Sequence, residues 1–215
     1  MVMLGILLAL QVNNWNQKRL DRNESVEYHQ RMCDDLDMVI AFLEDVSGFS
    51  EMVHEGIFDA VDILESGAKN DLAINKMEFA LTNFYRLSRH LPEFTSYNEM
   101  RSTGKLDLIY SADLRKEIED YVIFRKLVST AYEDLNAKVN QSDFLDPYVK
   151  YGRGGGFSNV DIEFDFDALS RDQIAINTLS RYAFHWKTKS AFSKNLAESA
   201  KKLRVLVNQE LSKQK

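Results

Sequence analysis

The chain has 215 residues, of which 45% are hydrophobic and 28% are charged, as is typical of a folded domain of moderate size. Its formal net charge of −6 argues against a general nucleic-acid-binding protein, because such a protein needs a concentrated basic surface. The single cysteine, Cys33, excludes an intrachain disulfide and a metal site with several cysteine ligands. Only two prolines occur, which favours long helices.

The N-terminal residues 1–12 read MVMLGILLALQV and contain no charged side chain. Polar residues then begin abruptly, and Trp15, Lys18 and Arg19 combine an aromatic ring with basic side chains, as is typical of a membrane–water interface. As a helix, the apolar run would cover about 18 Å, whereas a full membrane span needs about 20 residues. The run is therefore predicted to be the second half of a span whose beginning is missing from this sequence.

Two other interpretations of the run are open. It could be the core of a signal peptide, although it lacks a basic start and a small-residue cleavage site, or the buried first turn of a helical bundle. The abrupt change from apolar to interfacial residues favours the membrane span. The predicted organisation is the C-terminal part of a transmembrane helix over 1–12, an interfacial juxtamembrane segment over 13–22, and a soluble helical bundle over 23–215.

Three stretches carry a resemblance to a known family. GILLALQVNNWNQKR, from Gly5 to Arg19, resembles the end of the N-terminal membrane span in a family of uncharacterised short membrane-anchored bacterial proteins, a domain of unknown function. In that family the span ends in ALQ, then isoleucine or valine, then NNWN. The stretch from Thr95 to Val122 is similar to the family's central pattern, and Phe166 to Leu179 is a weaker third match.

The resemblance implies a single-pass protein of the cell membrane, with the bundle on the periplasmic side. By themselves, the positive charges that follow the apolar run favour the opposite orientation. Both orientations therefore stay open. The family has no assigned activity, so the resemblance predicts architecture and location and no chemistry.

Apolar residues recur every three or four positions along most of the chain, which predicts amphipathic helices. These helices are expected over residues 14–46, 50–65, 70–91, 113–141 and 172–211. A further short helix is expected within residues 93–110. The predicted fold class is all-α: a membrane-anchored antiparallel bundle of four long helices plus shorter ones.

Several residues predict where these helices begin or end. Gly48 is expected to end the first helix, and Ser50 to cap the start of the second. Pro92 is expected to stop the third helix, Gly104 to turn the chain, and Ser111 to cap the next helix.

Residues 142–170 are the least regular part of the chain. Pro147 and the glycines between 152 and 156 predict a loop, because neither residue type favours a helix interior. Residues 160–166 then alternate between apolar and acidic side chains, which predicts a short strand or an extended arm.

Four groups of residues raise the question of a binding site. His29 and Cys33 share a helical face but lack further metal ligands, so a packed thiol beside an imidazole is favoured. Glu51 and His54 form a single Glu-x-x-His, whereas di-iron bundles need two. The glycine loop lacks a phosphate-binding motif. The last group is acidic and comprises Asp161, Glu163, Asp165 and Asp167. We interpret it as the solvated face of a strand and not as a calcium site.

Arg125 falls on the apolar stripe of the helix predicted over 113–141. A guanidinium there must be paired, reach solvent or bind an anion. We favour a structural pair with a carboxylate such as Glu117 or Asp120. The sharper alternative is an arginine that anchors a ligand inside a sensory bundle.

The sequence carries no motif for a catalytic nucleophile, metal site or cofactor, so catalytic, metal and cofactor residues are predicted to be none and the chain is not expected to be an enzyme. The favoured function is a membrane-anchored helical interaction or scaffold module of the bacterial envelope. Its expected partners are membrane lipid and either another protein or a second copy of the chain, with no nucleic acid. The alternative is a ligand-sensing helical bundle that binds a small anion or metabolite; an uncharacterised enzyme has the least support.

Overall fold

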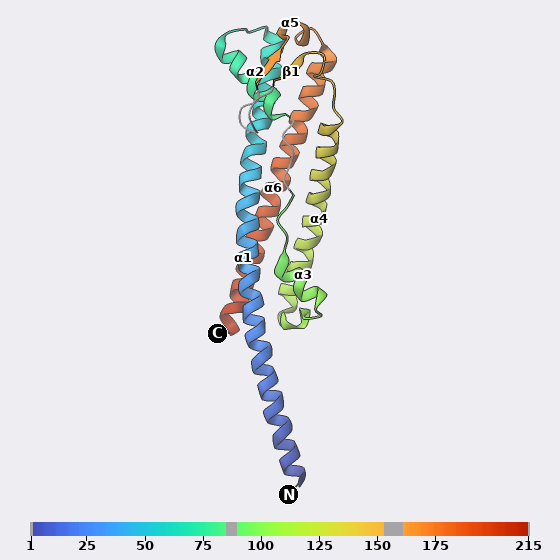
Figure 1. Ribbon diagram of the computed structural model, residues 1–215. Coiled ribbons are helices and arrows are strands. Elements are labelled where there is room, and N and C mark those ends of the chain that lie inside the picture. The colour runs from blue at the N-terminus through green and yellow to red at the C-terminus, as the bar shows by residue number, and fades with distance from the viewer. Residues whose placement is uncertain (1, 85–89, 153–160, 215) are drawn as a thin grey trace. The chain divides into compact units, whose positions relative to one another are not determined.

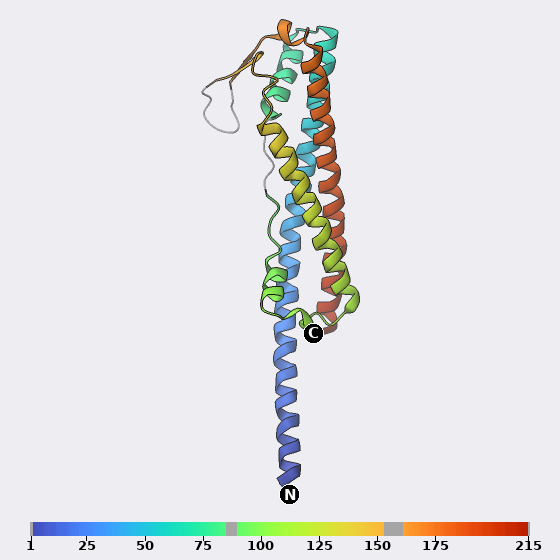
Figure 2. The same ribbon diagram turned by 90° about the vertical axis from the view of Figure 1, so that its right-hand side faces the viewer.

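The computed structural model describes residues 2–84, 90–152 and 161–214 and is mostly helical (Figure 1 and Figure 2). The chain divides into two compact units, and each of its three long helices contributes to both. Unit 1 comprises Met1–Phe42, Leu91–Arg125 and Leu196–Lys215, and unit 2 comprises Leu43–His90 and Lys126–Asn195.

The first helix, α1 (Val2–Ser66), is continuous for 65 residues. The prediction that Gly48 would separate two helices is wrong, because one glycine in a helix costs only about 1 kcal/mol and flanking packing outweighs it. Ser50 is not a cap either: its hydroxyl donates to the carbonyl of Val46, one turn earlier, at 2.6 Å. The helix ends instead before Gly67, which has φ +71°, a conformation that favours glycine.

Helix α2 (Asp71–Asn83) begins at an asparagine cap, where the side chain of Asn70 accepts from the amide of Ala73 at 2.9 Å. The sequence predicted a helix over 70–91 that Pro92 would stop. Residues 85–89 lie outside the described residues, but His90 and Leu91 are not helical, so the prediction is wrong at its end.

Unit 1 packs α3 (Thr95–Ser102), the 3₁₀ turn η1 (Leu106–Leu108), and parts of α4 (Ala112–Asn140) and α6 (Gln173–Gln214) against α1. Ion pairs and hydrogen bonds define the direction of α6. Arg22 donates to the carbonyl of Gln214, and Asp37 pairs with Arg204 at 3.0 Å, so α6 runs antiparallel to α1 here. The core of the unit is apolar and includes Met32, Leu36, Val39, Leu114, Ile118, Tyr121, Leu203 and Val207.

Helix α3 is attached to α1 by polar contacts. Asp35 accepts from the amide of Ser96 at 2.8 Å and from its hydroxyl at 2.7 Å. Glu99 accepts from Tyr28 at 3.0 Å and pairs with Arg31. The short helix and the turn predicted between residues 93 and 110 are confirmed: Gly104 has φ +73°.

Unit 2 contains α2, α5 (Phe166–Leu169) and the remaining parts of α1, α4 and α6. His54 of α1 donates from Nδ1 to the carbonyl of Ala183, and Ser47 contacts Ser190, so α1 and α6 are antiparallel here too. The cluster of buried residues that forms the core of this unit includes Val53, Ile57, Met77, Leu81, Phe84, Leu145, Leu169, Leu179 and Trp186.

A two-stranded hairpin completes unit 2. Strand β1 (Val149–Tyr151) pairs antiparallel with β2 (Ile162–Phe164). The extended segment predicted from the alternating residues is therefore confirmed over β2. Most of the predicted glycine loop, residues 153–156, lies outside the described residues.

The all-α class is confirmed, but the count of long helices differs from the prediction because the first two predicted helices are both part of α1. The cap predicted at Ser111 is found, because its hydroxyl accepts from the amide of Leu114. Asp172, where the last helix was expected to begin, also caps that helix by accepting from the amides of Ile174 and Ala175, which the sequence analysis did not predict. Within the described part of the chain, no helix carries an apolar stretch long enough to cross a membrane.

Candidate functional site

The N-terminal arm of α1, residues 3–20, has no neighbour in unit 1. All its residues are exposed, and in both views it continues past the other segments of that unit (Figure 1 and Figure 2). Over residues 3–12 the large apolar side chains of the arm are between 53% and 80% exposed. They are Met3, Leu4, Ile6, Leu7, Leu8, Leu10 and Val12.

These apolar side chains surround the arm. Successive residues of an α-helix are rotated by about 100°, so residues 3–12 point in every direction, and Gln11 is the single polar residue among them. A helix that packs on one protein surface is apolar on one face only. The arm is instead apolar on all sides, which is typical of a helix that is surrounded by an apolar medium.

The residues predicted to lie at a membrane interface follow directly on the same helix. Trp15 is 65% exposed, and the guanidinium of Arg19 lies 5.8 Å from the centroid of its ring. Arg19 also donates to the side chain of Asn16 at 3.3 Å. Lys18 is exposed. The four residues form a polar collar at the end of the apolar arm.

The structure places Arg125 differently from the prediction. Its guanidinium donates to the carbonyls of Leu91 and Pro92, at 3.3 Å and 2.5 Å, and its nearest carboxylate is that of Glu93, at 3.9 Å. The predicted partner Glu117 pairs with Lys202 at 2.7 Å. Arg125 therefore satisfies backbone carbonyls in the segment before α3.

The two histidine motifs are part of the core and of helix packing. His29 is fully buried and donates from Nδ1 to the carbonyl of Ser25 at 2.6 Å. Cys33 is 1% exposed, and burial raises the pKa of its thiol. Glu51 pairs with Lys187, and the hydrogen bond from that lysine is the main reason that the pKa of Glu51 is lowered. Among the described residues, no group of three or more His, Cys, Asp or Glu could hold a metal ion.

The acidic residues of the extended segment are exposed, as the sequence predicted. Two of them have structural roles. Asp165 caps α5 by accepting from the amide of Ala168 at 2.9 Å, and Asp167 pairs with Lys69 at 2.6 Å.

Lys189 is a candidate that the sequence analysis missed. It lies in α6 and is only 5% exposed. Its ammonium group is 4.3 Å from the ring centroid of Trp186 and 5.5 Å from that of Tyr132. Burial lowers its pKa to about 8. A signal existed in the sequence, because Lys189 occupies the apolar stripe of its helix, just as Arg125 does.

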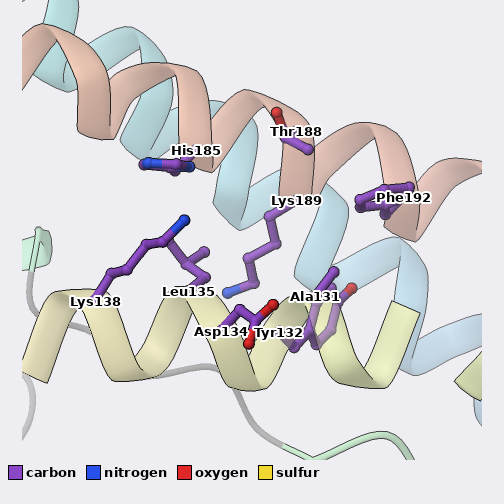
Figure 3. A pocket seen from close by; sticks show the side chains of 9 residues that line it. All are labelled: Ala131, Tyr132, Asp134, Leu135, Lys138, His185, Thr188, Lys189 and Phe192. Atoms are coloured by element: carbon purple, nitrogen blue, oxygen red, sulfur yellow. The ribbon is translucent and has the colours of Figure 1, made fainter. Parts of the chain in front are cut away.

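Lys189 lines a cavity of about 180 Å³ in unit 2, between α4 and α6 (Figure 3). The side chain extends from α6 toward α4, where Asp134 and Leu135 lie, while Lys138 and His185 lie together to one side. The full lining is Ala131, Tyr132, Asp134, Leu135, Lys138, His185, Thr188, Lys189 and Phe192.

Comparisons with models of protein families, with characterised proteins and with solved structures found no match to this chain. The family resemblance of the three sequence stretches therefore stays a prediction.

Proposed function

We propose that the chain is a membrane-tethered helical interaction module, in which the N-terminal arm of α1 inserts into the hydrocarbon layer of a bilayer. The observation that carries this proposal is the exposure of apolar side chains on every face of residues 3–12. Water is a poor solvent for such a helix. Burying one fully exposed leucine is worth about 1.5–3 kcal/mol, so transferring the seven large apolar side chains is worth on the order of 10 kcal/mol.

The dimensions of the arm agree with insertion that ends at the polar collar. Residues 3–12 cover about 15 Å as a helix, which is about half of a hydrocarbon core of about 30 Å. Trp15 then lies at the level of the headgroups, where its ring is stable, and Lys18 and Arg19 reach the phosphates. After its first turn, whose amide N–H groups have no acceptor within the helix, the arm satisfies its own backbone hydrogen bonds, as a segment in lipid must.

A bilayer explains the arm better than a protein groove does. A groove covers one face of a helix and would leave the apolar side chains on the opposite face in water. Lipid chains surround the helix and cover all faces equally. Membrane lipid is therefore the proposed partner of the arm.

The interaction role of the bundle rests on the continuity of α1. The same helix that carries the arm also forms part of the core of unit 1, through residues such as Met32 and Leu36, so it holds the unit at the membrane surface. A folded unit that is held at a surface encounters partners there at a raised effective concentration. We propose another envelope protein, or a second copy of the chain, as that partner, and the family resemblance supports the bacterial envelope as the location.

Vesicle flotation of the full chain tests insertion. Wild-type protein is expected to float with uncharged phosphatidylcholine vesicles, in which electrostatic attraction is absent. Leu7→Lys is expected to weaken binding about 100-fold, because a lysine inside the hydrocarbon costs about 3 kcal/mol. Leu72→Lys is the matched control, since Leu72 is 66% exposed on α2 and lies in unit 2.

The control variant should float like wild type. Failure of the wild-type chain to float would contradict the proposal, and so would equal flotation of Leu7→Lys. Sedimentation at several protein concentrations tests the alternative that a second copy of the chain, and not lipid, covers the arm. If the arms pair with each other, the apparent molecular mass in the absence of lipid rises with protein concentration, and it is lower for Leu7→Lys than for wild type.

A further inference from the structure

Among the residues that the structure describes, the ammonium group of Lys189 is buried without an anionic partner. Within the described residues, its ammonium group makes no hydrogen bond or ion pair, and its neighbours are the faces of Trp186 and Tyr132. An ammonium over an aromatic face is attracted by the ring quadrupole, but each ring replaces only part of the lost hydration. A buried lysine in this position weakens the fold, so its presence needs an explanation other than packing.

The hydroxyl groups beside Lys189 bond to each other and to the backbone, and neither accepts a hydrogen bond from the ammonium in the described part of the chain. Ser193 donates to the carbonyl of Lys189 at 2.8 Å, and the hydroxyl of Tyr132 therefore donates to Ser193 at 2.5 Å. Both hydroxyl protons are used in this chain. The ammonium is left facing the cavity (Figure 3).

The surroundings of the cavity are also more basic than acidic. Lys138 and His185 join Lys189 in the lining, against a single acidic side chain, Asp134, which is exposed. Burial lowers the pKa of His185, and the positive charges of Lys138 and Arg181 lower it further. The imidazole of His185 is therefore uncharged at neutral pH, and the two lysines against one aspartate would attract a negative group.

The remaining walls of the cavity are apolar. Ala131, Leu135 and the ring of Phe192 contribute carbon atoms, and Leu135 is buried. The volume of about 180 Å³ equals that of about six water molecules at about 30 Å³ each. That space suits a molecule of about six to nine non-hydrogen atoms.

We propose that this cavity binds a small organic monocarboxylate. The carboxylate lies against the ammonium of Lys189, within reach of Lys138 and His185, and the hydrocarbon part packs on Leu135 and Phe192. One carboxylate neutralises the one buried ammonium, and the apolar walls favour a ligand with a hydrocarbon part over inorganic phosphate. Lysine and carboxylate then form a charge-assisted pair in a partly enclosed site.

This inference goes beyond the membrane tether and does not depend on it. The arm belongs to unit 1, and every residue that lines the cavity belongs to unit 2. Variants in the arm should therefore leave carboxylate binding unchanged, and variants in the cavity should leave flotation unchanged.

Titration calorimetry of the full chain tests the proposal with pairs of ligands that differ in charge alone. Butyrate is compared with butyramide, and benzoate with benzamide. At least one of the two carboxylates should bind, and its neutral amide should bind roughly 10- to 100-fold more weakly, because it lacks the ion pair. Binding of amide and acid with equal affinity would overturn the proposal, and so would the absence of any heat from both carboxylates at millimolar concentration.

Two variants connect the binding to this cavity. Lys189→Met keeps the length of the side chain and removes its charge, so it should weaken carboxylate binding roughly 10- to 100-fold and leave amide binding unchanged. Lys126→Met is the matched control, because Lys126 is exposed on α4 and does not line the cavity. Carboxylate binding that survives Lys189→Met would overturn the proposal.

A third variant keeps the lysine and removes the space. Ala131→Phe places a ring in the cavity and should abolish binding of benzoate before that of the smaller butyrate. Circular dichroism checks that each variant is folded. Benzoate binding that is unchanged in folded Ala131→Phe would place the ligand elsewhere and contradict the proposal.

Discussion

The ammonium of Lys189 lies 4.3 Å from the centre of the Trp186 ring, one turn earlier on α6. This contact places a positive charge in the core of unit 2, where its hydration is lost. The cation–π contact with the aromatic face stabilises the ammonium by about 0.5–2 kcal/mol, which is less than the cost of burying the charge.

Lys189→Met is therefore expected to stabilise the protein. Replacing a buried ionic group by an apolar one of similar volume is neutral or stabilising by about 1–4 kcal/mol. Urea denaturation at pH 7 should give a larger free energy of unfolding for Lys189→Met than for wild type, with an unchanged m-value. A loss of more than about 1 kcal/mol would mean that the ammonium is stabilised by its surroundings.

The same residue predicts a pH dependence of stability. Burial lowers the pKa of Lys189 to about 8, below its ordinary value of 10.5. Between these two values the unfolded chain binds the proton and the folded chain does not, so the free energy of unfolding from this group rises as the pH rises through 8. Below pH 8 both states are protonated and the cost of the buried charge is constant.

The measurement is the difference in unfolding free energy between Lys189→Met and wild type. It should be largest below pH 8 and should shrink by about 3 kcal/mol toward pH 10.5. Taking the difference cancels the opposite contribution of Tyr121, whose pKa burial raises to about 12. A difference that is independent of pH would contradict the lowered pKa of Lys189.

Arg125 is expected to act on stability through backbone carbonyls. Arg125→Ala leaves the carbonyls of Leu91 and Pro92 without their donor and should lower the free energy of unfolding by about 1–3 kcal/mol. Glu93→Gln is the control, because its carboxylate is 3.9 Å away and mostly exposed, and it should change stability by less than about 0.5 kcal/mol. Equal effects of both variants would mean that the ion pair, and not the carbonyls, positions the arginine.

Two glycines at α1 should respond to alanine in opposite directions. Gly48 lies inside the helix with nothing within 4 Å of an added Cβ, so Gly48→Ala should stabilise by about 0.5–1 kcal/mol. Gly67 has φ +71°, where a Cβ is strained, so Gly67→Ala should destabilise by about 1–2 kcal/mol. Thermal unfolding of the two variants compares them directly. A destabilising Gly48→Ala would indicate that α1 is interrupted at that residue.

The sequence predicted well what depends on local patterns. The helical class, the cap at Ser111, the turn at Gly104 and the extended segment near Ile162 all follow from side-chain periodicity and backbone preference. Those signals are local, and the structure confirms them. The alternation of residues 160–166 also predicted that the acidic side chains of this segment are exposed to solvent.

The errors arose where packing outweighs local preference or where partners are distant in sequence. Gly48 looked like a helix end, but the helix continues because residues before and after it, such as Val46 and Val53, are both buried in unit 2. Arg125 was assigned a carboxylate on its own helix, whereas its acceptors are more than thirty residues away. Lys189 was overlooked although it lies on the apolar stripe of its helix, and one of its aromatic neighbours, Tyr132, lies on another helix.

The central claim is that the arm of α1 lies in a bilayer, and the fluorescence of Trp15 measures this most directly. Phosphatidylcholines that carry bromine at known depths quench tryptophan by contact. We expect quenching of wild-type protein to be strongest with bromine near the headgroups, and to disappear in Trp15→Phe, which retains only the buried Trp186. Absence of quenching in wild type, or equal quenching in Trp15→Phe, would contradict insertion of the arm.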